Sequence, residues 1–432
     1  MIPVRLAATQ VLNQLFHGKG SLSSLLGPAQ IQIVDQDKSL LQELCFGTCR
    51  YHPQLTIFSE LLLDKPLRNK DSDIQALILL GLYQLLHTRI PDHAAIGETV
   101  EVTRLLKKEW ASKLVNGVLR QFQRDKESLK KIALENKTYQ SNHPQWLEGM
   151  LSKYWPQQWP EIIQANQSHP PFCLRINTRK ISREDYVILL AEKSIQASLT
   201  TFSPYGIRLE NACNPNLLPL FAEGLISVQD ESAQLSADLL GLQPNMRILD
   251  ACCAPGGKTG HLLEVQPDLQ VTALELEERR LQRVRENLQR LNLHAEIICG
   301  DGTKPEVWWN GEQFDRILID APCSATGIIR RHPDIKILRK PDDISKLAEI
   351  QLNLLQKLWP LLKPSGILLY VTCSIIPKEN TKIIERFLAT QSDADEDKII
   401  SDWGLVQTHG KQLLPQVDSH DGFYYARLVK QV

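Results

Sequence analysis

The sequence contains no long hydrophobic run, and this absence limits the classes of protein to which the chain can belong. Its longest strongly apolar stretch, residues 76–86, is far shorter than the about 20 apolar residues that a membrane-spanning helix needs. Residues 1–16 have amphipathic spacing in place of the uninterrupted apolar core of a secretion signal. The nine cysteines are an odd number, which fits reduced thiols better than a disulfide framework. We therefore expect a cytoplasmic protein with no membrane segment.

An excess of positive charge is also missing. The formal net charge is -1 over 432 residues, so the whole chain gives no sign of binding nucleic acid. The charge is uneven, however, because residues 101–140 hold ten Lys and Arg against five Asp and Glu. A basic face in that region would contact RNA phosphates, but a solvated helix surface would give the same counts. Charge alone leaves both interpretations open.

The first part of the chain has helical periodicity. A length of 432 residues exceeds what one hydrophobic core usually holds, so two or three domains are expected. Short polar or proline-containing joints separate segments with apolar residues three and four positions apart, which are residues 6–16, 40–46, 55–63, 74–86, 96–106 and 114–122. The pattern predicts an all-α bundle over residues 1–140.

The middle of the chain, residues 141–235, predicts a linker helix followed by a small α/β subdomain. Strand-like residues 172–177 and 206–209 flank a helical segment at 182–193. No aromatic ribonucleoprotein signature is present, so stacking of RNA bases on this subdomain is not predicted.

Residues 236–432 alternate between strand and helix patterns. Strands are expected at 247–250, 271–276, 295–299, 316–319 and 367–371, and helices at 260–265, 277–291, 344–359 and 379–388. Such alternation predicts a doubly wound, Rossmann-like α/β domain with a parallel sheet. Ligands of these sheets bind beyond the carboxyl ends of the strands.

Three motifs begin at those strand ends, DACCAPGGKT at 250–259, DAPCSATG at 320–327 and TCS at 372–374. Carbon 5 of cytosine is a poor nucleophile until a thiolate adds to carbon 6, and a cysteine is suited to add there and later leave. The glycine turn fits neither a P-loop nor a dinucleotide fingerprint, but its backbone can approach a nucleotide-like methyl donor closely. We expect the three motifs to converge on one pocket.

These motifs, in this order, resemble the RNA (cytosine-5) methyltransferases that use S-adenosylmethionine. Among them the chain is most similar to the bacterial small-subunit ribosomal RNA methyltransferase B group, also called Fmu or Sun, because it carries SVQDESAQ at 227–234, GIIRRHPDIK at 327–336 and DGFYYA at 421–426. GLYQL at 81–85, IPDHAAI at 90–96 and LVNGVLR at 114–120 resemble the NusB RNA-binding fold. The resemblance implies methylation of one cytosine in 16S ribosomal RNA by an enzyme with a NusB-like first domain and a small RNA-binding subdomain. We expect a monomer.

The resemblance also assigns the cofactor site. It implies that the methionine part of S-adenosylmethionine is wrapped by Cys252, Cys253, Ala254, Pro255, Gly256, Gly257 and Lys258. Glu275 would hold the ribose hydroxyls, and Asp301 would lie beside the adenine, with Asp320 also bordering the cofactor. The family commonly has Ala at Cys253 and Asp at Glu275. A Glu can still accept two hydroxyl hydrogen bonds, so we expect a shifted cofactor position and no loss of binding.

Chemistry alone does not choose between the two loop thiols, because either needs a nearby cation or dipole to ionise. The DNA cytosine-5 methyltransferases use a Pro-Cys thiol, which would nominate Cys323. The RNA family uses the Thr-Cys thiol, which nominates Cys373 as nucleophile and leaves Cys323 to help resolve the covalent intermediate. Asp320 is then expected at the edge of the cytosine ring, and Lys258 is expected to contact the base or to lower a thiol pKa.

Basic residues follow the Asp320 loop, and we expect phosphate contacts from Arg330, Arg331, His332 and Lys336. No metal is expected, because Cys45 and Cys49 lie one helical turn apart without a second ligand pair, which favours buried packing over zinc. Two alternatives remain open. One is the same chemistry on transfer RNA or another ribosomal site, and the other is a non-catalytic RNA-binding assembly or antitermination factor.

Overall fold

The computed structural model describes residues 1–432, which form two compact units. The first unit comprises Met1–Ser168 and Ile329–Pro341, and the second comprises His169–Ile328 and Asp342–Val432. The first unit therefore includes one short segment that follows the motif at 320–327 in the chain. None of the helices in either unit is both long and apolar enough to cross a membrane.

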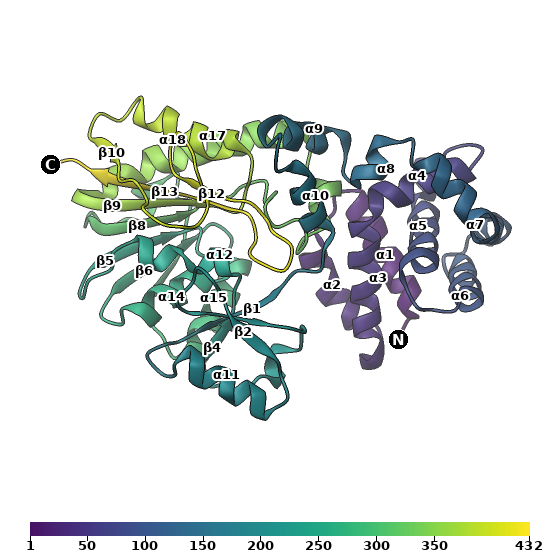
Figure 1. The fold of residues 1–432 in the computed structure, drawn as a ribbon, viewed down its shortest axis with the longest axis horizontal. Helices are drawn as coiled ribbons and strands as arrows, with labels where there is room; N and C mark the ends of the chain where they lie inside the picture. The colour runs from purple at the N-terminus through teal and green to yellow at the C-terminus, as the bar shows by residue number, and fades with distance from the viewer. The chain divides into compact units, whose positions relative to one another are not determined.

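A helical bundle makes up most of the first unit (Figure 1). Its main helices are α1 Val4–Phe16, α2 Leu22–Gln30, α3 Lys38–Arg50, α4 His52–Leu62, α5 Ser72–His87, α6 Asp92–Leu105 and α7 Ala111–Ala133. Helix α5 contacts α1, α3, α4, α6 and α7, and it is central because its run of apolar residues is buried on every side. The predicted all-α bundle is confirmed. Helix α2 was not predicted, since it is only nine residues long and contains Pro28, and a capping box at Ser21 and Ser24 begins it.

Four short helices complete the first unit, α8 Lys137–Ser141, α9 Gln145–Tyr154, α10 Trp159–Gln167 and α16 Ile335–Leu338. Asn142, which follows α8 in a left-handed conformation, donates a hydrogen bond of 2.9 Å to the carbonyl oxygen of Arg50 in α3. The first unit thus extends beyond the predicted bundle end at residue 140, to Ser168.

The second unit begins with a small antiparallel sheet. Its strands are β1 Phe172–Ile176, β2 Ala197–Leu199, β3 Gly206–Leu209 and β4 Ile226–Val228, in the order β2-β3-β1-β4. Helix α11 Arg183–Glu192 contributes Tyr186 and Leu190 to the core beside Leu174 and Ile207. The predicted α/β subdomain is confirmed, although β2 and β4, at three residues each, were too short for the sequence pattern to reveal.

The larger sheet of the second unit contains five parallel strands in the order β7-β6-β5-β8-β9, of which β5, β6, β8 and β9 are labelled in Figure 1. These are β5 Arg247–Ala251, β6 Gln270–Glu275, β7 Glu296–Cys299, β8 Phe314–Asp320 and β9 Leu362–Thr372. The helices are α12 Glu231–Gln234, α13 Ser236–Leu239, α14 Gly257–Val265, α15 Glu278–Leu291, α17 Pro341–Leu358 and α18 Thr381–Leu388. The strand order reverses between β5 and β8, which is where such sheets bind ligands.

Antiparallel strands extend this sheet beyond β9. Strand β13 Phe423–Lys430 pairs with β9, and β12 Lys411–Leu413 and β11 Leu405–Val406 follow outward, while β10 Ala394–Glu396 pairs with β13. The predicted parallel sheet is therefore confirmed as the centre of a mixed sheet of nine strands. The sequence did not reveal the extension, because β13 is buried over most of its length and lacks the alternation of a half-buried strand.

Candidate active site

The three motifs lie at one edge of the larger sheet. Ala251 at the end of β5 pairs with Ile319 of β8, and Asp320 at the end of β8 pairs with Val371 of β9. The loops that follow these strands therefore leave the sheet side by side. Convergence follows from parallel pairing, since the carboxyl ends of neighbouring parallel strands meet at the same edge.

Two thiols meet between the second and third loops. The Sγ atoms of Cys323 and Cys373 are 3.5 Å apart, and the backbone N–H of Gly327 donates to the Cys373 carbonyl oxygen at 2.9 Å. Cys323 is only 8% exposed, whereas Cys373 is partly exposed. Its contact with Cys373, together with burial, raises the pKa of Cys323 well above the usual range. Cys323 is therefore a neutral thiol that can donate its proton in a hydrogen bond to the Cys373 sulfur.

An ion pair joins the first and second loops. Lys258 Nζ, in the first turn of α14, donates to Asp320 Oδ2 at 2.6 Å. The ammonium also lies 5.3 Å from the centre of the Phe423 ring, in the first residue of β13. These contacts fix a cation and a carboxylate at the point where the strand order reverses.

The backbone of the glycine loop has a positive φ angle at two positions. Cys252 has φ of 61° and Gly256 has φ of 93°, in the left-handed region. A Cβ atom at position 256 would lie 3.2 Å from the Cα atom of Val284 in α15, so glycine also permits a close approach of the loop to that helix. From α15, Arg280 donates to the Ala254 carbonyl oxygen at 3.1 Å and Asn287 to that of Pro255 at 2.8 Å. Helix α15 thus holds the loop in place.

Two further acids lie at the ends of β6 and β7. Buried Glu275 accepts hydrogen bonds from Arg280 Nη1 at 3.1 Å and from the backbone N–H groups of Ala254 and Glu277 at 3.3 Å. Asp301 accepts from the backbone N–H and the hydroxyl of Thr303, at 2.9 and 2.7 Å. Burial acts to raise the pKa of Asp301, but the bonds from Thr303 and the charge of Lys304 outweigh it, so the pKa lies below the usual value.

Asp250 is a member of this site whose part the sequence did not reveal. It is fully buried, and its Oδ2 accepts the Thr259 hydroxyl at 2.6 Å while Oδ1 has no hydrogen-bond partner. Burial, and to a lesser extent the nearby charges of Asp320 and Glu275, raises the pKa of Asp250 to about 7. A buried oxygen without a donor is costly in an apolar setting, which marks it as a place for a positively charged or hydrogen-bonding ligand.

Comparison with known proteins identifies the family. Residues 237–429 match the family 16S rRNA methyltransferase RsmB/F. Residues 143–216 match the ferredoxin-like domain of RsmF/B-like methyltransferases, and residues 3–124 match the NusB family. The ribosomal RNA small subunit methyltransferase B of Pseudomonas putida is 54% identical over 428 residues, which cover 99% of this chain and 98% of that protein. The chain belongs to the ribosomal RNA small subunit methyltransferase B family.

Solved structures support the fold of this family member. The crystal structure of PH0851 has a TM-score of 0.83 at 21% identity and covers 100% of this chain and 99% of its own. A methyltransferase homolog protein from Pyrococcus horikoshii has a TM-score of 0.60 at 29% identity, with coverage of 68% and 98%. The predicted combination of a NusB-like bundle, a small α/β subdomain and a Rossmann-like methyltransferase domain is confirmed.

Arg175 is a second residue of this methyltransferase site that sequence reasoning missed. It lies in β1 with 0% of its side chain exposed and pairs with Glu264 of α14 at 2.8 and 2.9 Å. It also donates to the carbonyl oxygen of Gly257 at 2.6 Å and to Gln229 Oε1 at 2.6 Å. The one signal for it was a single charged residue in an otherwise apolar strand. Arg175 ties the small sheet to the end of the glycine loop.

Two of the predicted RNA-binding residues are buried. Lys336 is 3% exposed, and its Nζ donates to the carbonyl oxygens of Arg50 and Asn142, the latter at 3.0 Å. Arg330 is 0% exposed, and its carbonyl oxygen accepts from Arg50 Nη2 at 2.8 Å. Both positions contradict the prediction of phosphate contacts, because a buried cation cannot reach a phosphate in solvent. Arg331 and His332 are half-buried.

Cys45 and Cys49 lie in the core of the helical bundle, where the predicted packing role is confirmed. No group of three or more His, Cys, Asp or Glu side chains with the arrangement of a metal site is present.

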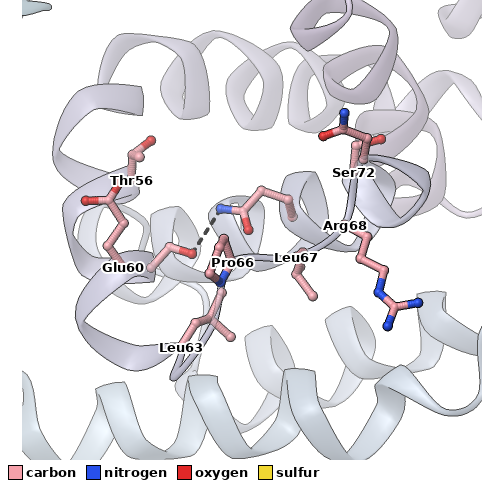
Figure 2. Close-up of a pocket in the computed structure, with 10 residues that line it drawn as sticks. Thr56, Glu60, Leu63, Pro66, Leu67, Arg68 and Ser72 are labelled. Atoms are coloured by element: carbon pink, nitrogen blue, oxygen red, sulfur yellow. Dashed lines mark hydrogen bonds between the residues drawn. The ribbon is translucent and has the colours of Figure 1, made fainter.

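A pocket of about 510 Å³ lies in the first unit and is distinct from the methyltransferase site (Figure 2). Its lining comes from α4, α5 and the segment between them, and it is Thr56, Ser59, Glu60, Leu63, Pro66, Leu67, Arg68, Asn69, Ser72 and Gln75. Gln75 Nε2 donates to the Ser59 hydroxyl at 3.0 Å in its wall. The pocket contains no thiol and none of the motif residues.

Proposed function

We propose that this chain transfers a methyl group from S-adenosylmethionine to carbon 5 of a cytosine in 16S ribosomal RNA. The observation that carries the proposal is the pair of thiols 3.5 Å apart, at the ends of β8 and β9 and beside the glycine loop. Membership of a family of 16S ribosomal RNA methyltransferases supports it. Carbon 5 must become nucleophilic before it can accept a methyl group, and a cysteine that adds to carbon 6 makes it so.

The two thiols are suited to different roles. We assign Cys373 as the nucleophile, because its side chain is partly exposed and the neutral thiol of Cys323 can stabilise a thiolate at Cys373 by donating a hydrogen bond. Attack forms the bond between Cys373 Sγ and carbon 6. After methyl transfer the proton on carbon 5 must leave, and the bond to sulfur must break.

Cys323 is placed to act in that second stage. A hydrogen bond with Cys373 and burial raise the pKa of Cys323, and its Sγ atom lies 3.5 Å from Cys373 Sγ. From that position Cys323 can help to remove the proton from carbon 5 so that Cys373 departs. We further infer that Asp320 contacts the edge of the cytosine ring while Lys258, bound to Asp320, contacts the base or assists thiol ionisation.

The residues present fit S-adenosylmethionine, which supplies an electrophilic methyl group when bound. Its sulfonium and ammonium groups are cations. Asp250 Oδ1, which has no hydrogen-bond partner, and the carboxylates of Asp301, Glu275 and Asp320 can face them, although Glu275 and Asp320 already pair with Arg280 and Lys258. The loop from Cys252 to Lys258 would wrap the methionine part, and Asp301 would lie beside the adenine. Glu275 already accepts three hydrogen bonds of the about four that a carboxylate can take, so Arg280 must shift for both ribose hydroxyls to bind.

The RNA would be held outside the catalytic pocket as well. The NusB-like unit, with its basic residues at 101–140, is the proposed source of phosphate contacts, and Arg331 and His332 stay candidates. Since the proposed substrate is ribosomal RNA, we place the enzyme in the cytoplasm and propose that it acts as a monomer.

The experiment is nucleoside mass spectrometry after incubation of 16S ribosomal RNA, 23S ribosomal RNA and transfer RNA with the protein and methyl-labelled S-adenosylmethionine. We expect labelled 5-methylcytosine in 16S RNA and none with Cys373→Ala. Label confined to transfer RNA or 23S RNA would show that this RNA, and not 16S RNA, is the substrate. Binding of RNA without methyl transfer to any of the three would favour the non-catalytic assembly factor.

A further inference from the structure

One buried carboxylate lies behind both cysteine loops. Glu379 follows β9 in the short turn before α18, and its side chain is fully buried. Its Oε1 accepts the backbone N–H of Ser324 at 2.7 Å and Gln351 Nε2 at 3.3 Å. Its Oε2 accepts the hydroxyl groups of Ser324 and Ser374, the latter at 2.6 Å. A carboxylate only accepts hydrogen bonds, so it matches a set of four donors.

Two of these donor residues directly follow the two cysteines in the chain. Ser324 directly follows Cys323, and Ser374 directly follows Cys373, so a single side chain bridges the neighbours of both thiols. The Thr326 and Ser374 hydroxyls lie 3.2 Å apart, and the Ile375 backbone N–H donates to the Thr326 hydroxyl at 3.1 Å. These contacts join the two loops through polar groups that are buried.

Glu379 is itself held by the sheet. Its carbonyl oxygen accepts the Tyr370 hydroxyl of β9 at 2.7 Å, and the next residue, Asn380, accepts the Thr372 hydroxyl at 2.6 Å and donates to the Ser374 carbonyl oxygen at 2.9 Å. The carboxylate is therefore anchored to β9 and reaches across to the loop that follows β8. Burial raises the pKa of Glu379, and the hydrogen bonds from Ser324, Ser374 and Gln351 oppose that rise.

We infer that Glu379 is a positioning residue that sets the distance between the Cys323 and Cys373 thiols. This inference rests on the proposed function for the roles of the two thiols. Glu379 touches no reacting atom and acts through Ser324 and Ser374. Attack by one sulfur and release assisted by the other both require fixed placement, and a shift of about 1 Å from a remote change can lower a rate about 100-fold.

The test compares Glu379→Ala and Glu379→Gln with wild type and with Glu349→Gln. Glu349 is the matched control, because it is an exposed glutamate of the same unit whose carboxylate pairs with Arg386 at 2.8 Å. The thiol distance is probed with phenylarsine oxide. Two As–S bonds form as the As–O bond breaks, and both thiol protons leave with the oxygen as water, so adjacent thiols become bridged. Peptide mass spectrometry separates the bridge between Cys323 and Cys373 from those at other cysteines.

We expect Glu379→Ala to lower the rate of this bridging about tenfold and kcat about 100-fold, with the KM for RNA and the Kd for S-adenosylmethionine within about twofold of wild type. Glu379→Gln keeps one acceptor oxygen, so the bridging rate and kcat should both fall, each by a smaller factor than in Glu379→Ala. Glu349→Gln should match wild type.

An unchanged bridging rate in either folded variant, or wild-type protein that is not bridged, overturns the inference. A loss of kcat without slower bridging does the same, because it separates activity from thiol placement. If Glu379→Ala does not fold, Glu379→Gln and Ser374→Ala decide by the same criteria. Bridging requires no RNA, so failure of the proposed methylation would leave the test of the thiol distance intact.

Discussion

The buried pair of Arg175 and Glu264 gives a sharp prediction about stability. Arg175→Met removes a guanidinium that donates to both oxygens of Glu264 at 2.8 and 2.9 Å and to the Gly257 carbonyl oxygen at 2.6 Å. The Glu264 side chain, 4% exposed, would then be a buried charge without its partner. Breaking a buried pair in this way costs about 3–5 kcal/mol, and the free energy of unfolding should fall by that amount.

The double variant Arg175→Met/Glu264→Met separates this reason from a simple loss of packing. Replacement of a buried ion pair by apolar side chains of similar volume is often neutral, so the double variant should recover most of the lost stability. Urea unfolding followed by tryptophan fluorescence, at a fixed pH, measures all three proteins. A double variant as unstable as Arg175→Met alone would refute the reasoning, since it would show that the unpaired carboxylate of Glu264 was not the cause.

Three further outcomes are expected. Glu275→Ala should weaken S-adenosylmethionine binding by about 1–3 kcal/mol in calorimetry, and unchanged affinity in folded protein would remove Glu275 from the site. Ionised Asp250 should favour a cationic cofactor, so the affinity for S-adenosylmethionine should increase as the pH is raised through about 7. If Asp250→Asn shows the same increase in a pH titration, Asp250 is not its cause. Burial lowers the pKa of Lys336 to about 7, so between that pH and the ordinary lysine value the unfolded chain binds the extra proton. The free energy of unfolding of wild type relative to Lys336→Met should therefore rise with pH in that window, and urea curves with a constant or falling difference would exclude a buried, neutral amine.

The architecture was largely predictable from periodicity. Helix α5 has apolar residues at helical spacing over its whole length, and the strand patterns at 247–250 and 316–319 correspond to the buried centres of β5 and β8. Strand β13 escaped prediction, because a strand that is buried on both faces lacks alternation, and its pairing with β9 is a contact between distant segments.

The site was predictable where topology alone brings residues together. Parallel pairing puts the ends of β5, β8 and β9 at one edge, and so it unites the glycine loop with Cys323 and Cys373. Partners from other parts of the chain were not predictable. Glu379 bonds to Ser324 from 55 positions away, and Arg175 to Glu264 from 89.

Charge in the sequence did not show which cations are exposed to solvent. Lys336 stands in a basic stretch, yet its amine lies inside the helical unit on two backbone carbonyl oxygens. A neutral lysine amine has two N–H donors, which matches those two acceptors. The sequence shows how many cations a segment contains. It does not show that the carbonyl oxygens of Arg50 and Asn142, which are distant in the chain, accept the hydrogen bonds of buried Lys336.

The measurement that tests the central claim most directly is denaturing gel electrophoresis of protein mixed with 16S ribosomal RNA and S-adenosylmethionine. Addition of Cys373 to carbon 6 precedes methyl transfer, so Cys373→Ala should give no covalent protein–RNA species. Cys323→Ala permits attack but slows release, so a denaturant-resistant adduct should accumulate when the cofactor is present. An adduct with Cys373→Ala and none with Cys323→Ala would reverse the two roles, and no adduct with either variant would contradict the covalent mechanism.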